Sequence, residues 1–421
     1  MTTASVAAVP ARPTRLAVLS WALYDLANTV FSMNIVSLYF SLWVVNIMGG
    51  TDASYGNANA LSMFLMFVSA PALGALSDQA GRRMPFLVVT TLLCITFTAL
   101  LGTGGLVLSL IFFIIANYMF QAGLIFYDSL LPVVSTEENR GTVGGLGIGL
   151  GYMGSFIGVG SGLLLLDRIG YVGMFRLSAL LFLVFAIPCF LFVREHGRAG
   201  GFRFDMKMVT GAFTQVRHTI PHAREFPGLL RFLIGRFFYT DPANTVIVFM
   251  SIYVTNEVGF TATQAQILLL VAIVFAVVGG FAWGWVVDRI GPKRSLNLVL
   301  ILWMVALAGA IATAVFDLPG VLFWGVACLA GIALGGTWAA DRPYMLRLAP
   351  PKYLGEFYGL YSMVGRFAAI IGPFMWGLIV DTLGWGRPAA VGALLVFMVI
   401  AFTILQGVDD HPREWPEELR V

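Results

Sequence analysis

The sequence predicts an all-α membrane protein with twelve transmembrane helices in two six-helix bundles, on three observations. Of its 421 residues, 59% are hydrophobic and only 11% are charged. A soluble domain carries about 25% charged residues, so much of this surface must face lipid. Apolar runs of about 20 residues, the length that crosses a bilayer, recur along the chain, and the two halves of the chain repeat each other.

Twelve apolar runs are separated by polar residues, glycine or proline. We expect membrane helices at residues 17–47, 57–76, 86–105, 107–133, 142–165, 171–193, 228–255, 263–287, 295–315, 320–346, 354–382 and 388–407. The first run contains Asp25 and exceeds the length of a signal-peptide core, so we expect it to be retained. The first, fourth, seventh, tenth and eleventh runs are interrupted by polar residues, which indicates helices that face protein or water.

Positive charges predict the orientation and the domain organisation. Arg and Lys gather in the connections after the even-numbered helices, which the positive-inside rule places in the cytoplasm with both termini. The long basic connection, residues 194–227, is expected to carry helical stretches on the membrane surface. It separates a bundle at 1–193 from a bundle at 228–408 and a tail at 409–421. We therefore expect a multi-pass protein of the cell (inner) membrane.

The internal repeat is the most specific signal in the sequence. Residues 25–30 read DLANTV and residues 241–246 read DPANTV. Residues 74–83, GALSDQAGRR, match residues 284–294, GWVVDRIGPKR, and glycines of the fifth predicted helix match those of the eleventh. All matches have offsets of 210 to 216 residues. Six helices per repeat is an even number, so the halves enter the membrane in the same direction and form a parallel repeat.

Residues 74–83 resemble the G-x-L-A-D-x-x-G-R-K signature of the major facilitator superfamily, in its usual place between the second and third helices. The segment at 284–294 is similar to the C-terminal copy of that signature. The resemblance covers nearly the whole chain. It implies a transporter with the major facilitator fold, whose first, fourth, seventh and tenth helices line a central cavity.

A narrower resemblance is to the vacuole-effluxer, or autophagy-related amino-acid exporter, family. It is carried by residues 21–28 (WALYDLAN), 237–241 (FFYTD), 130–132 (LLP) and 145–152 (GLGIGLGY). This resemblance implies amino-acid export. One departure is Asp128, where the family pattern leads us to expect a neutral Asn.

Ionisable residues inside the apolar runs are the candidates for substrate or proton binding. A charge at the centre of a bilayer costs about 2.5–3.5 kcal/mol on insertion scales, so these residues must face one another or water. With neighbouring polar and aromatic groups at helical spacing, the candidates are Asp25, Asn28, Asn117, Gln121, Tyr127, Asp128, Arg236, Tyr239, Asp241, Asn244, Trp338, Asp341, Arg342 and Arg366. We expect the carboxylates of both halves to meet in one cavity, with Arg236, Arg342 and Arg366 as counter-ions.

Two aspartates are expected to act as gates. Asp78 and Asp288 each follow a helix and precede glycine and basic residues. An aspartate is stabilised at a helix N-terminus, here that of the eleventh and the fifth helix, respectively. The alternative is a plain turn with a topogenic basic cluster. The proposed gating residues are Gly74, Asp78, Gly81, Arg82, Arg83, Gly284, Asp288, Gly291, Lys293 and Arg294.

Together these observations favour a secondary active transporter of a small zwitterionic solute, by alternating access and with protons as a candidate coupling ion. The alternatives are an exporter of amphiphilic drugs or lipids and a ligand sensor that does not transport. An enzyme is disfavoured because the sequence offers no nucleophile–base pair or phosphate loop. Cys94, Cys189 and Cys328 lie far apart in apolar runs, so we expect no metal and no cofactor. A net charge of +3 is too small to suggest nucleic acid, and we expect a monomer in a lipid bilayer.

Overall fold

The first half of the chain forms six membrane helices. The computed structural model describes residues 13–50, 52–195 and 221–420. The first helix is α1 (Arg15–Phe31) with its continuations η1 (Ser32–Tyr39), α2 (Phe40–Leu42) and η2 (Trp43–Ile47). It is followed by α3 (Asp52–Ala80), α4 (Met84–Ala99), α5 (Gly105–Ser129), the short α6 (Leu131–Val134) and α7 (Arg140–Phe192). The long α7 consists of two helices that meet at Gly170, where φ is 65° and ψ is 179°.

The second half repeats this pattern. It contains α9 (Leu229–Asn256), α10 (Ala262–Ile290), α11 (Pro292–Val315), α12 (Val321–Leu348), η3 (Pro351–Tyr353), α13 (Leu354–Gly377) with its continuation η4 (Leu378–Thr382), α14 (Arg387–Gln406) and α15 (Glu417–Arg420). Among the described residues, ten helices are long and apolar enough to cross a membrane when α7 is divided in two. The other two of the twelve predicted membrane helices are α4 and α9. Helix α4 is shorter, with 16 residues, and α9 carries the charged residues Arg231, Arg236 and Asp241. The predicted fold class is confirmed.

The boundaries differ from the predicted ones at two places. The third helix ends at Ala99 rather than at residue 105, because Gly102, Gly104 and Gly105 all adopt positive φ angles. The fifth and sixth helices were predicted to be separated by residues 166–170 but are joined through the bend at Gly170. The surface helices predicted for the central connection fall mostly on residues 196–220, outside the described residues.

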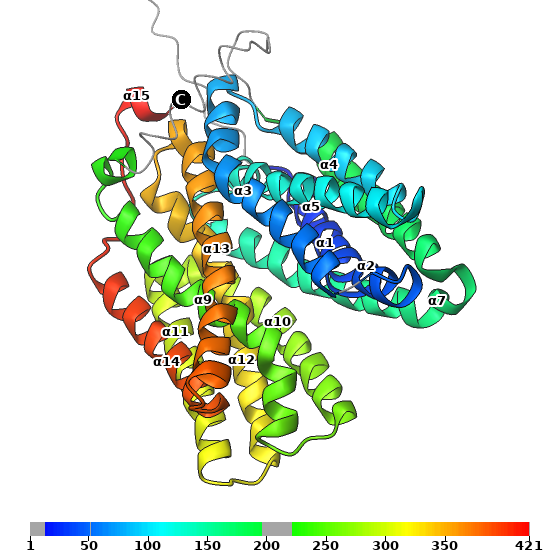
Figure 1. The fold of residues 1–421 in the computed structure, drawn as a ribbon. Helices are drawn as coiled ribbons and strands as arrows, with labels where there is room; N and C mark the ends of the chain where they lie inside the picture. The colour runs from blue at the N-terminus through cyan, green and yellow to red at the C-terminus, as the bar shows by residue number, and fades with distance from the viewer. Residues whose placement is uncertain (1–12, 51, 196–220, 421) are drawn as a thin grey trace, which may run out of the picture.

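The two bundles meet at one end of the molecule. Helix α3 of the first bundle packs on α13 of the second, and α7 packs on α10. The bundles approach each other at the end that carries the C-terminus and diverge toward the other end (Figure 1). At the closed end Asp78 contacts Gly355 and Glu356, Arg83 contacts Glu195, and Glu356 contacts His222. We call it the linker end because Glu195 and His222 belong to the central connection.

Glycines allow the close approach at the linker end. A Cβ atom added at Gly74 would lie 1.9 Å from the carbonyl oxygen of Gly355, and one added at Gly145 would lie 2.6 Å from Cα of Gly284. Contacts this short exclude any side chain. Small residues at such crossings let helix backbones pack closely within a membrane, so these glycines set the distance between the bundles.

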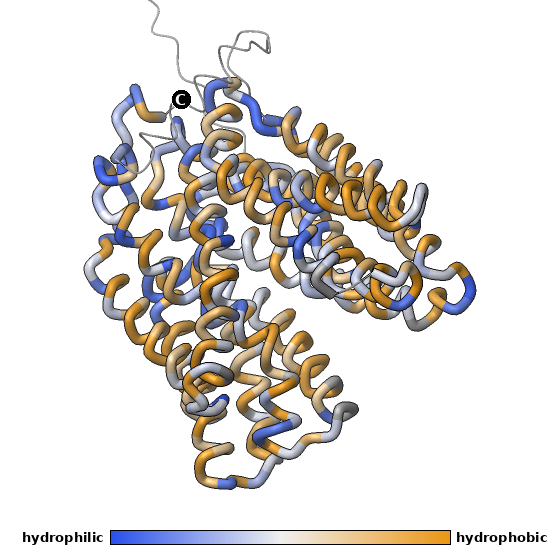
Figure 2. Tube along the Cα trace, viewed as in Figure 1, coloured by the Kyte–Doolittle hydropathy of each residue, from blue (hydrophilic) through white to orange (hydrophobic). Residues whose placement is uncertain are grey.

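Hydropathy is distributed as a bilayer requires. Apolar residues cover most of the helices, while hydrophilic residues concentrate at the helix ends and at points where the bundles meet (Figure 2). Large side chains such as Phe64, Val107 and Leu164 are exposed on the outside. The polar residues inside the helices are therefore found at the bundle centre, where the candidate site lies.

Adding one methyl group at Gly74 should force the linker end apart. We expect Gly74→Ala to lengthen the distance between spin labels placed at Arg82 and Arg294, which are exposed on opposite bundles at this end. Double electron–electron resonance on a variant without Cys94, Cys189 and Cys328 measures this distance. The control is Gly56→Ala in the same helix, where an added Cβ has no atom within 4 Å. An unchanged distance in Gly74→Ala would contradict the close approach of α3 and α13.

Candidate functional site

Arg342 joins the two bundles through buried ion pairs. Its side chain leaves α12, and Nη1 donates a hydrogen bond of 3.2 Å to Oδ2 of Asp25 in α1. Its Nε lies 3.0 Å from Oδ1 of Asp128 in α5. All three residues are buried. One guanidinium thus serves two carboxylates of the opposite bundle, nearer the linker end than the other end of α5 and α12.

A second cluster lies within the C-terminal bundle. Nε of Arg236 in α9 lies 3.2 Å from Oδ2 of Asp341 in α12. Asp341 also accepts hydrogen bonds from Tyr239 (2.6 Å) and from Tyr361 of α13 (2.8 Å). The guanidinium of Arg236 lies over the ring of Tyr361 at 3.5 Å from its centroid. Asp341 is therefore fully partnered, and its neighbours come from two other helices, α9 and α13.

Aromatic rings line the first cluster on the side of the N-terminal bundle. Tyr127 stacks on Trp21 at a centroid distance of 4.6 Å and on Tyr24 at 5.0 Å. The guanidinium of Arg342 lies 5.6 Å from the centroid of the Tyr127 ring. The hydroxyl of Tyr127 is buried without a hydrogen-bond partner among the described residues. This hydroxyl is available to a ligand.

Two predicted site residues lie away from these clusters. Asn117 donates hydrogen bonds to Asn59 (2.9 Å) and Ser62 (2.7 Å) of α3 and accepts one from Gln121 at 3.5 Å. Asn117 therefore joins α5 to α3, and with Gln121 it extends the polar stripe that leads to Asp128. Trp338, in contrast, lies beside the second cluster, with 6.0 Å between the Arg236 guanidinium and its ring centroid.

Arg366 does not form the predicted ion pair. No carboxylate of the described chain lies within ion-pair distance of its guanidinium, and its Nε has no hydrogen-bond partner there. The reason is that Asp128, the carboxylate whose charge acts on Arg366, is paired with Arg342. Arg366 contributes an unneutralised positive charge beside the two clusters.

The aspartates of the repeated motif have different environments. Asp25 is paired with Arg342, but Asp241 belongs to neither cluster. Asp241 is 0% exposed and lies against Gly372 of α13. The expectation that all carboxylates share one cavity is therefore wrong for Asp241, because a neighbouring helix encloses it. Asn28 is buried one turn after Asp25, and Asn244 is half-buried one turn after Asp241.

Two carboxylates clamp the linker end across the bundle interface. Asp78 of α3 accepts hydrogen bonds from the amides of Gly355 (2.9 Å) and Glu356 (2.7 Å), in the first turn of α13. Asp288 of α10 accepts them from the amides of Gly141 (2.6 Å) and Thr142 (2.7 Å), in the first turn of α7. Each carboxylate satisfies two amides that have no partner within their own helix. The two clamps are related by the sequence repeat.

The other proposed gating residues shape or flank these clamps. Gly81 and Gly291 adopt φ angles of 65° and 87°, which the turns after α3 and α10 require. Lys293 donates to the carbonyl groups of Gln406 (2.9 Å) and Val408 (2.6 Å) at the end of α14, within its own bundle. Arg82 and Arg294 are exposed.

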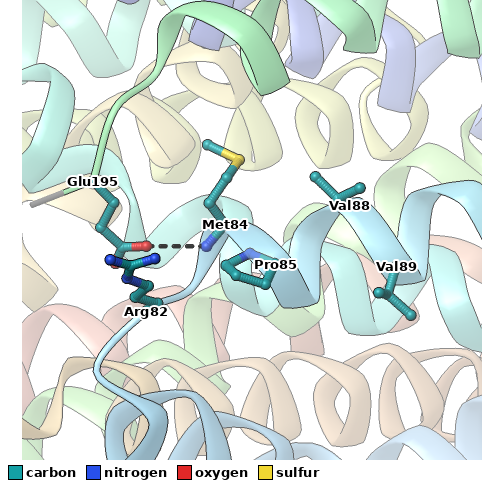
Figure 3. A pocket seen from close by; sticks show the side chains of 6 residues that line it. All are labelled: Arg82, Met84, Pro85, Val88, Val89 and Glu195. Atoms are coloured by element: carbon teal, nitrogen blue, oxygen red, sulfur yellow. Dashed lines mark hydrogen bonds between the residues drawn. The ribbon is translucent and has the colours of Figure 1, made fainter. Parts of the chain in front are cut away.

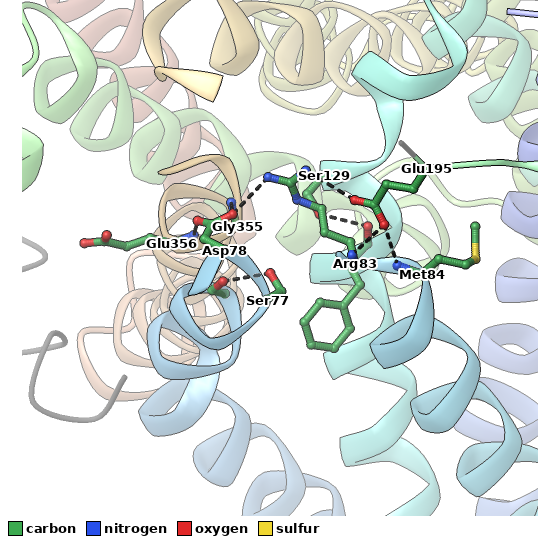
Figure 4. A network of polar contacts seen from close by, with 10 residues as sticks. Ser77, Asp78, Arg83, Met84, Ser129, Glu195, Gly355 and Glu356 are labelled. Carbon is green, nitrogen blue, oxygen red and sulfur yellow. Dashed lines mark hydrogen bonds and ion pairs between the residues drawn. The ribbon is translucent and has the colours of Figure 1, made fainter. Parts of the chain in front are cut away.

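The sequence analysis missed residues that attach the central connection to the first clamp. Arg83 pairs with Asp78 at 2.9 Å and with Glu195 at 3.6 Å. Glu195 also accepts hydrogen bonds from the amides of Arg83 and Met84 at the start of α4 (Figure 4). At the other end of the connection, His222 lies 3.2 Å from Glu356. For Glu195 the sequence offered one signal, which is that it is an acidic residue within a basic segment. Tyr361, which binds Asp341, gave no comparable signal.

Two pockets lie outside the buried charges. One, at the linker end, is lined by Arg82, Met84, Pro85, Val88, Val89 and Glu195 (Figure 3). The other is an apolar groove between α3, α9 and α13, lined by residues that include Phe67, Phe237 and Phe367. Neither contains a residue of the two clusters.

Comparison with known proteins now defines the family. A profile of the vacuole effluxer Atg22-like family matches residues 50–413. The chain belongs to this family. An uncharacterized MFS-type transporter, YxiO of Bacillus subtilis (strain 168), is 26% identical over 417 residues, covering 93% of this chain and 94% of the relative. Autophagy-related protein 22 of Coccidioides immitis (strain RS) is 26% identical over 297 residues, covering 64% of this chain and 49% of the relative.

Solved structures of major facilitator transporters share the fold. A bacterial homologue of the iron transporter ferroportin, in an outward-facing state, has a TM-score of 0.73 at 17% identity, covering 93% of this chain and 99% of that one. The proton:xylose symporter XylE has a TM-score of 0.70 at 13% identity, covering 94% and 96%. The predicted resemblance to both the superfamily and the vacuole effluxers is confirmed, and the chain is a membrane transporter of the major facilitator type.

Within this Atg22-like chain, the two clusters can exchange partners with a charged ligand. The contacts Arg342 Nε–Asp128 Oδ1 and Arg236 Nε–Asp341 Oδ2 have ion-pair distances but lack hydrogen-bond alignment. Poorly aligned pairs are weaker than bidentate ones. An ammonium or carboxylate group of a ligand could replace one member without leaving the other unpaired.

Removing Arg342 should destabilise the protein more than removing an exposed arginine. Breaking a buried ion pair costs about 3–5 kcal/mol, because a charge is left without a partner, and here two carboxylates lose theirs. We expect Arg342→Gln to lower the midpoint of thermal unfolding in detergent, while Arg294→Gln has little effect. Adding Asp25→Asn and Asp128→Asn to the Arg342→Gln variant should restore most of the lost unfolding midpoint, because no carboxylate is then left without a partner. Equal midpoints for Arg342→Gln and Arg294→Gln would show that these pairs do not hold the bundles together.

Proposed function

We propose that this protein is a secondary active transporter of small zwitterionic solutes, with free amino acids as the substrate class. The observation that supports this most directly is the charge of the buried centre. Three guanidiniums (Arg236, Arg342, Arg366) stand beside three carboxylates (Asp25, Asp128, Asp341), and all come from helices at the bundle interface. A centre with equal numbers of both charges accommodates a ligand with one charge of each sign at the lowest electrostatic cost.

The geometry suggests how such a ligand would bind. The ammonium group would take the place of Arg342 beside Asp128, whose Oδ1 lacks an aligned donor. The ligand carboxylate would bind the released Arg342 and the nearby Arg366. The stacked rings of Trp21 and Tyr127 would contact its side chain. This arrangement keeps each buried charge partnered, as a low-dielectric site requires.

Alternating access is supported by the arrangement of contacts between the bundles. Among the described residues, the hydrogen bonds and ion pairs that join the bundles lie at the linker end or at the central charges. Opening the linker end requires the loss of the Asp78 and Asp288 contacts. The distribution of Arg and Lys supports a cytoplasmic linker end in the cell membrane, in which case this conformation faces outward.

The serious alternative is an exporter of amphiphilic molecules, and the apolar groove beside Phe67, Phe237 and Phe367 is the observation that favours it. A groove without charged residues suits a lipid-like molecule. The buried ion pairs are unexplained by that function, which is why we favour the zwitterion.

Counterflow in reconstituted vesicles tests the proposal. Vesicles preloaded with a mixture of unlabelled amino acids should accumulate labelled neutral amino acids, and Asp128→Asn and Arg236→Gln should lower the initial rate at least tenfold. Glu257→Gln, which removes an ion pair with Arg387 outside the site, should leave the rate unchanged. Protein-dependent movement of a lipophilic dye with no amino-acid counterflow would favour the amphiphile exporter. Ligand-induced thermal stabilisation without counterflow would favour a sensor.

A further inference from the structure

Asp241 and Thr245 form a buried polar site that the two charge clusters do not explain. Both side chains are 0% exposed. Apart from the backbone amide of Gly372, which faces the carboxyl group, no group of the described residues offers a hydrogen bond to the oxygens of Asp241 or to the hydroxyl of Thr245. A Cβ added at Gly372 would lie 2.9 Å from both Asp241 oxygens and 1.9 Å from Oγ1 of Thr245. Three buried oxygen atoms therefore gather in the space left by one glycine.

The repeat provides an internal comparison. Asp25 and Thr29 are the corresponding residues of the first half, and they too pack against a glycine, Gly151. There the carboxylate is neutralised by Arg342, and the hydroxyl donates to the carbonyl group of Asp25 at 3.1 Å. The same local motif is satisfied in one half and unsatisfied in the other. Buried polar groups are almost always partnered, so the second copy differs from the first in needing something that its own side chains do not supply.

Charge identifies what is bound. No cation of the described chain lies within ion-pair distance of Asp241. The charged groups on its own helix and on the four helices packed against it are Arg231, Arg236, Asp288, Arg289, Asp341, Arg342, Arg347, Glu356, Arg366 and Arg387. Of the arginines in the two clusters, Arg236 and Arg342 are paired with other carboxylates. Arg366, beside the clusters, is unpaired among the described residues but lies beyond ion-pair distance of Asp241. An ionised Asp241 would be a lone charge in the membrane interior, whereas a metal ion would need more oxygen ligands than these three.

We propose that Asp241, with Thr245 as its hydrogen-bond partner, is a proton-binding site separate from the zwitterion site, and that it is loaded in this conformation. The bound proton removes the charge of the carboxylate and gives it an O–H group that can donate to Oγ1 of Thr245, which lies against the same glycine, Gly372. This inference rests on one part of the proposed function, namely that the protein cycles between two conformations. In that cycle the proton would be released when water reaches Asp241, which would couple transport to the proton gradient.

Infrared spectroscopy tests the site without any substrate. We expect the spectrum of the purified full chain at neutral pH, minus that of Asp241→Asn, to contain the C=O stretch of a protonated carboxyl group. The same stretch should persist in Thr245→Val but shift in frequency, because its hydrogen bond is lost. Carboxylate bands in place of the C=O stretch would overturn the proposal, as would an unshifted band in Thr245→Val. If Asp241→Asn fails to fold, the Thr245→Val comparison alone decides.

Transport gives the second test. A gradient of one pH unit supports at most about tenfold accumulation through one coupled proton, since about 1.4 kcal/mol corresponds to a factor of ten. We expect wild-type vesicles and the Glu257→Gln control to accumulate labelled neutral amino acids in response to this gradient, and Asp241→Asn not to respond. A full response in Asp241→Asn would overturn the coupling role. Absence of counterflow in the wild type would instead refute the proposed substrate and leave the infrared result standing.

Discussion

The structure depends on the cost of placing ionised side chains in a membrane. Arg342, Asp25 and Asp128 are buried, and each is tolerable only because the others are present. Arg342 belongs to one bundle and both carboxylates to the other. The same requirement therefore makes the bundles adhere at their centre and leaves them with a polar site there. Hydrocarbon alone provides little attraction between helices, so these charges and the glycine contacts of the linker end determine how the halves fit.

The centre and the linker end are mechanically linked through α12. This helix carries Arg342 and Asp341, and it packs on α10, which carries Asp288, and on α7, whose first turn Asp288 holds. In the proposed transport cycle, a ligand that takes carboxylates from Arg342 would change the position that α12 prefers, and α12 packs on both α10 and α7. The clamp formed by Asp78 on α13 is connected to the central segment through Arg83 and Glu195. Each clamp is thus in contact with a part of the chain outside the bundle interface.

Much of this architecture could be predicted from residue patterns, and the exceptions have physical causes. Apolar length located the helices, and the repeated D-x-x-G motif located both clamp carboxylates, because the bilayer and the helix termini impose simple constraints. Which arginine pairs with which aspartate depends on the rotation of each helix within its bundle, which no local pattern encodes. Arg366 was therefore assigned a partner that it lacks, and Asp241 was placed in a cavity from which Gly372 separates it. Tyr361 was missed because a tyrosine within an apolar helix has many ordinary roles.

The repeat also explains why one Asp–Thr motif is satisfied and the other is not. Asp128 and Arg342 come from corresponding helices of the two halves, α5 and α12, and the repeat offsets of 210 to 216 residues match Asp128 to the segment of α12 that contains Arg342. Corresponding helices of a parallel repeat meet near the axis that relates the halves, and Asp128 and Arg342 are in contact at 3.0 Å. Such a contact must join unlike residues if it is to be attractive, since two aspartates or two arginines would repel. The half that supplies Arg342 neutralises Asp25 of the other half, while Asp128 cannot neutralise Asp241. The asymmetry that holds the bundles together therefore leaves Asp241 without a counter-ion.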